Sequence, residues 1–218
     1  MKYLDLQSWP RQNHFRFFSG FDYPQFSICA NVDITVFKHF LHHSHQSFFQ
    51  SMLYLVSRTA NVIPEFRYRI REDQVVIHDK IDLSFTFLAV DDIFNFCTAP
   101  YTENFSEFAS GLTTAKELTH SRELLDTGPD RDDLLYITSL PWISFTSVMH
   151  PIHMHPTDSI PRISWGKYSQ NGERVSLPLS IQAHHGLMDG IHAGKFYIQL
   201  QQYLDNPATV FKKTAQDS

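Results

Sequence analysis

One stretch in the last third of the chain constrains the fold more than any other. Two strand-like arms, residues 163–169 and 173–185, flank Asn171-Gly172, a dipeptide typical of a β-hairpin turn. Neighbouring side chains of a strand point to opposite faces, so the alternating apolar residues of the second arm share one face. They are Val175, Leu177, Leu179, Ile181 and Ala183. His185 continues this apolar face, whereas His184 lies on the opposite face.

A predicted turn and helix follow this histidine directly. The turn is at Asp189-Gly190, and the helix ends before Pro207, with apolar residues at helical spacing. An imidazole is largely uncharged at neutral pH, and a rigid strand end would fix its orientation, as a general base requires. His185 is therefore a candidate general base. The structural alternative makes His185 a hydrogen-bonded core residue and Asp189 an ordinary helix cap.

The rest of the chain alternates strand-like and helix-like segments. We predict strands over residues 25–33, 66–71, 74–78 and 85–88, and helices over 35–43, 46–61 and 104–118. No linker rich in glycine, serine or proline divides the sequence. We therefore expect residues 1–218 to form one α/β domain.

Charge and composition exclude several classes of protein. The formal net charge is -5, which argues against a nucleic-acid partner, because binding to phosphates needs a basic surface. No apolar run approaches the ~20 residues of a membrane span, and the start of the chain does not read as a signal peptide. We expect no membrane partner and a cytoplasmic location. The two cysteines, Cys29 and Cys97, are too few for a disulfide scaffold.

Metal binding and hydrolysis are less favoured. Three groups of histidines could be interpreted as metal ligands: His39, His42, His43 and His45; His150, His153 and His155; and His185 with Asp189 and His192. The first two groups have no carboxylate at an established spacing, and the third fits a base better, so we expect no metal. The sequence also lacks G-x-S-x-G, a P-loop and a dinucleotide fingerprint.

The segment from His184 to His192, HHGLMDGIH, resembles the HHxxxDGxH signature of chloramphenicol acetyltransferases. Further blocks are similar to that family and occur in its order: residues 9–15, 32–35, 139–142, 166–168 and 177–182. The resemblance extends from Trp9 to about Leu204.

This resemblance implies an α/β fold of the coenzyme-A-dependent acyltransferase type, in which a mixed β-sheet packs with helices. It also implies a homotrimer whose active sites lie between subunits, one subunit supplying the catalytic histidine and its neighbour much of the acceptor pocket. Acetyl-CoA would be the co-substrate, and a small-molecule acceptor would receive the acetyl group directly, without an acyl-enzyme.

The resemblance assigns roles to particular residues. His185 would be the base, Thr138 would donate a hydrogen bond to the oxyanion, and Asp189 would pair with Arg11 to hold the histidine loop. Ser164 would fix an ordered water near the tetrahedral intermediate. Two aromatic residues would lie beside the coenzyme tunnel, unless they are core residues: Trp142 and Tyr168.

The acceptor pocket departs from the family pattern. Phe18 replaces a tyrosine that touches the antibiotic, whereas Phe26 keeps the family's aromatic ring. His150 and Arg162 stand at apolar positions, so either these side chains point away or the acceptor differs from chloramphenicol. Two alternatives stay open: an acetyltransferase for another small alcohol or amine, and a non-catalytic trimeric protein that binds an apolar ligand.

Overall fold

The computed structural model describes residues 1–88, 92–120, 125 and 131–211. Its centre is a seven-stranded sheet in which six strands have the order β2-β10-β8-β7-β5-β6, and β9 pairs with β10. The bounds are β2 (Gln25–Asp33), β5 (Asp82–Leu88), β6 (Phe94–Ala99), β7 (Leu134–Leu140), β8 (Arg162–Gly166), β9 (Ser169–Asn171) and β10 (Arg174–His184). β7 is parallel to both β5 and β8, and the other pairs are antiparallel. The predicted mixed sheet is therefore present.

The expected hairpin forms between β9 and β10. Arg174 pairs with Asn171, and Gly172 has φ +60, a left-handed conformation that glycine adopts without steric cost. β10 is the longest strand and lies between β2 and β8. Its residues from Leu177 onward are buried on both faces. The strand that ends immediately before the predicted base, His185, is thus a rigid, central one.

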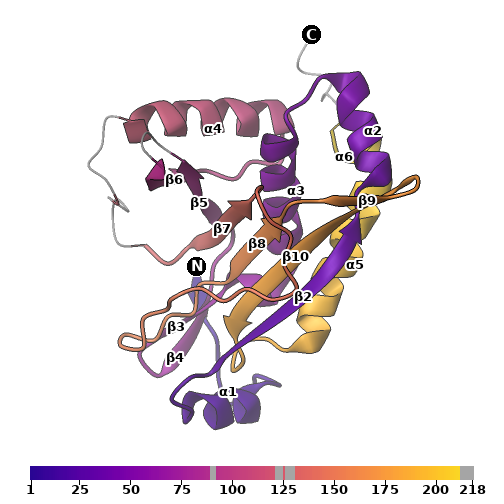
Figure 1. Cartoon of the computed structure of the whole chain (residues 1–218). Coiled ribbons are helices and arrows are strands. Elements are labelled where there is room, and N and C mark those ends of the chain that lie inside the picture. The colour runs from indigo at the N-terminus through magenta and orange to yellow at the C-terminus, as the bar shows by residue number, and fades with distance from the viewer. Residues whose placement is uncertain (89–91, 121–124, 126–130, 212–218) are drawn as a thin grey trace.

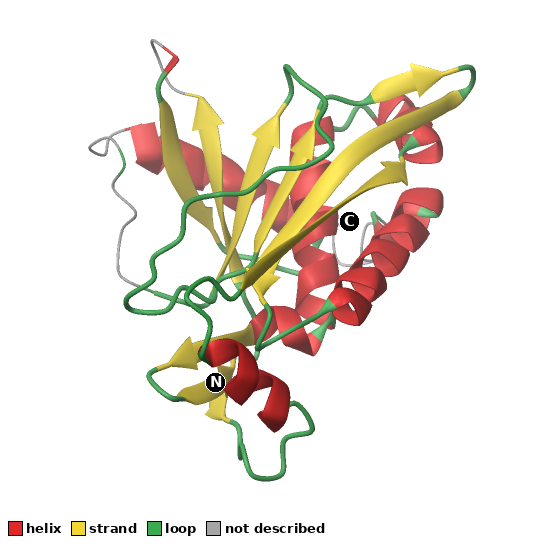
Figure 2. Cartoon of the chain, turned by 60° about the horizontal axis from the view of Figure 1, so that its bottom comes forward, coloured by secondary structure: helices red, strands yellow, loops and turns green. Residues whose placement is uncertain are grey.

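Helices cover one face of this sheet, and a long coil crosses the other (Figures 1 and 2). The helices are α2 (Thr35–Ser44), α3 (Phe48–Val62), α4 (Phe105–His120), α5 (Gly190–Asp205) and the short α6 (Pro207–Val210). Apolar side chains from β10, α3 and α5 form the core beneath them, including Ile181, Leu53 and Phe196. The coil, residues 141–161, packs on a polar face, where the side chains of Ser27 and Gln182 bind its backbone.

A second, three-stranded sheet and a short helix lie at one end of the large sheet (Figure 2). The small sheet has the order β1-β4-β3, formed by Lys2–Tyr3, Gln74–Ile77 and Tyr68–Arg71. Helix α1 (Gln12–Ser19) packs beside it through Trp9, Phe15 and Tyr68. The predicted strand over 66–71 begins two residues later than expected, because Pro64–Arg67 form a 3-10 turn. β1, α1, β6 and β7 were not predicted.

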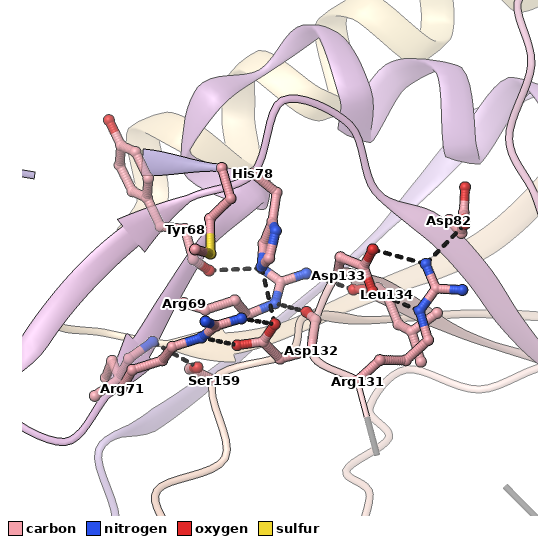
Figure 3. A network of polar contacts seen from close by, with 12 residues as sticks. Tyr68, Arg69, Arg71, His78, Asp82, Arg131, Asp132, Asp133, Leu134 and Ser159 are labelled. Carbon is pink, nitrogen blue, oxygen red and sulfur yellow. Dashed lines mark hydrogen bonds and ion pairs between the residues drawn. The ribbon is translucent and has the colours of Figure 1, made fainter. Parts of the chain in front are cut away.

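A buried arginine joins the two sheets (Figure 3). Arg69 is 0% exposed and donates hydrogen bonds to the backbone carbonyls of Phe66, Tyr68, Asp132 and Leu134. Burial lowers the pKa of Arg69 to about 10, so the side chain stays protonated at neutral pH. Its charge therefore meets four carbonyl dipoles, which locks β3 against the start of β7.

No helix among the described residues is long and apolar enough to cross a membrane.

Candidate active site

His185 follows directly after β10 and contacts two aromatic rings. Its backbone N–H donates to the carbonyl of Pro24 at 2.7 Å. The ring of Phe18 is stacked on the imidazole, with centroids 3.9 Å apart and planes 6° apart, and Phe26 lies at 4.8 Å. Nδ1 is buried without a hydrogen-bond partner among the described residues. Two of the predicted pocket residues, Phe18 and Phe26, therefore hold the predicted base in one orientation.

An ion pair closes the loop that follows His185. Arg11 Nη1 is 2.6 Å from Asp189 Oδ2, and Arg11 Nη2 donates to the carbonyl of His185 at 3.2 Å. Asp189 also caps α5, because its Oδ1 accepts from the Ile191 N–H. Burial acts to raise the pKa of Asp189, but the hydrogen bond and charge of Arg11 outweigh it and lower the pKa. The structure thus brings the expected Arg11–Asp189 pair together, and Asp189 is a helix cap as well.

The other two histidines of the motif have structural contacts that the sequence analysis did not assign. His192 accepts the Asp189 N–H at its Nδ1, and its Nε2 is 3.3 Å from Glu65 Oε1. His184 accepts the Gly186 N–H at its Nδ1, and burial, with a smaller effect from the charge of His185, lowers the pKa of His184 to about 4. The spacing of the motif, which places His184 before Gly186 and His192 three residues after Asp189, was the sequence signal for these contacts. Both imidazole rings bind the backbone of the loop that follows β10.

The structure does not support the metal alternatives. Within residues 1–88, 92–120, 125 and 131–211, no group of three or more histidine, cysteine or carboxylate side chains could hold a metal ion. His192 is turned toward Asp189 and Glu65, away from a site shared with His185. His39 and His43 contact each other on the exposed surface of α2.

Thr138 lies far from His185 within one chain. In the sheet register Thr138 is opposite Ser164, and Ser164 is opposite Ser180. Two strand spacings separate Thr138 from Ser180 by roughly 10 Å, and His185 lies about 16 Å further along β10. A base and an oxyanion donor must both reach the same reacting group. One chain alone therefore does not assemble the site predicted from the sequence.

His150 and Arg162 both find polar partners. His150 Nε2 is 2.7 Å from Ser164 Oγ, so these two predicted site residues are in direct contact. Arg162 forms an ion pair with Asp158, and its guanidinium lies over the ring of Tyr136 at 5.2 Å. The charge of Arg162 is thus compensated, and it is not a free cation in the pocket. Both polar residues at apolar family positions are accommodated by this chain's own side chains.

Trp142 and Tyr168 are surface residues. They are 62% and 43% exposed, so the alternative that they are core aromatics is wrong. Each follows the end of one of two neighbouring parallel strands, β7 and β8, whose last residues Leu140 and Gly166 are paired. The side chains therefore leave the same edge of the sheet. Lys38 Nζ lies 4.0 Å from the Tyr168 ring centre, which adds a positive charge there.

A cavity of about 800 Å³ lies beside His184, and His185 is not part of its lining. It is bounded by α1, the turn between β3 and β4, and residues 152–158, with His184 and Pro24 among its lining. Its volume falls within the roughly 300–1,000 Å³ that is common for small-molecule sites. Neither Thr138 nor Ser164 lines it.

Comparison with known proteins agrees with the geometry. Residues 1–201 match the family described as chloramphenicol acetyltransferase. The chain is similar to chloramphenicol acetyltransferase 2 of Escherichia coli, with 33% identity over 93% of this chain and 96% of the relative. Chloramphenicol acetyltransferase 3 of Escherichia coli is 31% identical, over 91% of this chain and 94% of the relative.

Solved structures give the same result for the fold. A chloramphenicol acetyltransferase structure superposes with a TM-score of 0.80 and 28% identity, covering 93% of this chain and 99% of that one. A dihydrolipoamide acetyltransferase of Azotobacter vinelandii, at 16% identity and a TM-score of 0.68, shares the fold; the coverage is 92% of this chain and 88% of that one. The predicted fold class is confirmed, and the chain belongs to the chloramphenicol acetyltransferase family.

Proposed function

We propose that this protein transfers the acetyl group of acetyl-CoA to the hydroxyl of chloramphenicol, with His185 as the general base. The observation that carries the proposal is the restraint on His185 in a chain of this family. Stacking on Phe18, the Pro24 carbonyl and the Arg11–Asp189 pair all restrict where the imidazole can lie. A positioned base of this kind accelerates proton transfer by roughly 10²–10⁴-fold.

The chemistry needs a base that accepts a proton and later returns it, and a hydrogen-bond donor for the oxyanion. His185 would take the acceptor's hydroxyl proton as that oxygen attacks the thioester carbonyl. The carbonyl oxygen becomes negative, and the Thr138 hydroxyl would donate a hydrogen bond to it. When the tetrahedral intermediate collapses, the carbon–sulfur bond breaks and the proton on His185 passes to the departing coenzyme A sulfur. No covalent acyl-enzyme is needed.

We further propose that the protein is a homotrimer with three sites between subunits. His185 and Thr138 are too far apart in one chain to reach the same atom, so a second copy has to bring its Thr138 to His185. Mixed trimers test this. His185→Ala and Thr138→Ala chains would each have strongly reduced activity alone, but random mixing would restore both groups at about a quarter of the sites and raise the activity above that of either variant. Mixtures no more active than either variant would contradict shared sites.

The acetyl-CoA end of the site would lie at the edge where Trp142 and Tyr168 emerge. Lys38 is beside Tyr168, and Lys167 is exposed next to it, so two cations are available for the phosphates of the coenzyme. The exposed rings of Trp142 and Tyr168 would stack on its adenine. We place the reaction in the cytoplasm because acetyl-CoA is the co-substrate.

Two observations favour other acceptors or ligands. His150 sits at an apolar family position, and its ring is bound to Ser164, so the site has more polar groups here than the family pattern, which suits a more polar alcohol or an amine. The cavity beside His184 could bind a small ligand without any chemistry. Incubating the protein with acetyl-CoA and a panel of alcohols and amines, and identifying products by mass spectrometry, separates these functions. An acetylated chloramphenicol supports the first proposal, another acetylated acceptor supports the second, and ligand binding with no product supports the third.

A further inference from the structure

Two neighbouring strands place hydroxyls side by side on the polar face of the sheet. Thr138 of β7 and Ser164 of β8 are paired in register, so their side chains point to the same face. Ser164 is only 1% exposed, and its Oγ is 2.7 Å from Nε2 of His150. The proposed oxyanion donor therefore has a second hydroxyl as its neighbour, and that hydroxyl already has a partner.

His150 is held rigidly in this position. The side chain of Gln182, 2% exposed in the middle of β10, accepts the backbone N–H of His150 at 2.7 Å and donates to its carbonyl at 3.2 Å. The coil carrying His150 is thus anchored to the central strand at this residue. Burial, with a smaller effect from the charge of Arg162, lowers the pKa of His150, which favours the neutral ring. A neutral ring with the proton on Nε2 donates to Ser164 and leaves the Ser164 proton available.

We propose that His150 is a positioning residue of the acetyl-transfer site: its Nε2–H binds Ser164 Oγ, so that the Ser164 hydroxyl donates, beside Thr138, to the developing oxyanion. The inference rests on the proposed acetyl transfer. A hydrogen bond received by Ser164 polarises its own O–H, because donors in a chain strengthen one another. The negative charge on the oxyanion favours the same arrangement, in which His150 donates to Ser164 and Ser164 donates to the oxyanion. No proton changes place between the two residues.

The same contact also resembles a serine nucleophile with its base. Two features argue against that interpretation. The carboxylate nearest to His150 in the sequence, Asp158, is engaged by Arg162 and does not orient the His150 ring as the third member of a catalytic triad would. His150 also lies beside a cation, which disfavours the protonated ring that a base must form. Ser164 is therefore placed to donate a hydrogen bond, and not to form an acetyl ester.

A double-mutant cycle tests this role. Ser164→Ala removes the donor and should lower kcat by up to about 10²-fold, as for a lost oxyanion donor. His150→Leu removes only the support and should lower kcat roughly tenfold, leaving KM for acetyl-CoA unchanged. In the Ser164→Ala background, His150→Leu should have no further effect. His150→Gln, whose amide N–H can reach Ser164, should recover most of the loss, and His42→Leu on the exposed α2 surface is the matched control.

Other outcomes would refute the role of His150, the role of Ser164 or the proposed function, and they can be told apart. Losses that multiply in the double variant, or full activity of His150→Leu, refute the role of His150 while acetyl transfer stands. An acetyl group found on Ser164 by mass spectrometry after rapid quenching shows a nucleophile in place of a donor. A wild-type protein that acetylates no acceptor refutes the proposed function itself and the role of His150 with it. If His150→Leu does not fold, His150→Asn, whose amide is too short to reach Ser164, takes its place.

Discussion

The Arg11–Asp189 ion pair separates two contributions to the site, the stability of the histidine loop and the orientation of His185. Asp189→Asn keeps the size of the side chain and the oxygen that caps α5, but it removes the charge that faces Arg11. Asp189→Ala removes the cap as well. Comparing the two variants therefore isolates the ion pair from the cap.

The structure sets the expected sizes. The two side chains are 12% and 27% exposed, so the 3–5 kcal/mol typical of breaking a fully buried pair is an upper bound. A charge-assisted hydrogen bond contributes about 1.5–3 kcal/mol, which is our expectation for Asp189→Asn. The lost cap should cost about 1 kcal/mol more in Asp189→Ala. Arg11→Lys keeps the charge but loses the paired contacts to Asp189 and the His185 carbonyl, so it should also be destabilising.

Urea denaturation at one fixed protein concentration measures these free energies of unfolding, since assembly would make them depend on concentration. The folded pKa of Asp189 is below its ordinary value of 3.8. The stabilisation by this carboxylate is therefore complete above that ordinary pKa and is lost as the pH falls through the lower folded pKa. Asp189→Asn should flatten this part of the pH profile. A variant as stable as the wild type at neutral pH would refute the structural role of the pair.

Substitutions at three further positions probe other parts of the structure. Gly166→Ala would place a methyl group 2.8 Å from the carbonyl of Ile143, so thermal melts should show a loss of roughly 1–3 kcal/mol; an unchanged melt contradicts the close approach. Phe18→Leu removes the ring stacked on His185, so steady-state kinetics should show a lower kcat with little change in KM for acetyl-CoA, whereas Phe18→Tyr should retain kcat. Arg69→Met leaves buried carbonyls without a donor, so denaturation should show a loss above about 3 kcal/mol, and a smaller loss would mean that the two sheets are joined by other contacts.

Local sequence patterns predicted the elements that carry the site. The hairpin at Gly172, the strand ending at His184 and the helix after Asp189 all follow from alternation, turn residues and helical spacing. The predicted β2 has the bounds found in the structure, Gln25–Asp33. These patterns involve residues that are close together in the sequence, so the sequence alone was sufficient to predict these elements.

Other features depend on contacts between distant segments. β7 carries Thr138, and its place between two parallel neighbours depends on pairing with β5 and β8, which are distant in the sequence. His150 lies in the coil and finds its partner Ser164 on β8, a contact that depends on how the coil packs on the sheet. Asp158 is only four residues before Arg162, but one lies in the coil and the other begins a strand, so no regular spacing indicated their ion pair. The exposure of Trp142 and Tyr168 likewise follows from the ends of two paired strands, which no single segment specifies.

In the proposed reaction, His185 removes the acceptor's proton during acetyl transfer. The most direct test measures the release of free coenzyme A thiol from acetyl-CoA, with and without chloramphenicol, for the wild type and for folded His185→Ala. We predict acceptor-dependent release by the wild type and a loss of roughly 10²–10⁴-fold or more in the variant. Release by His185→Ala at a rate close to that of the wild type would show that His185 is not the base.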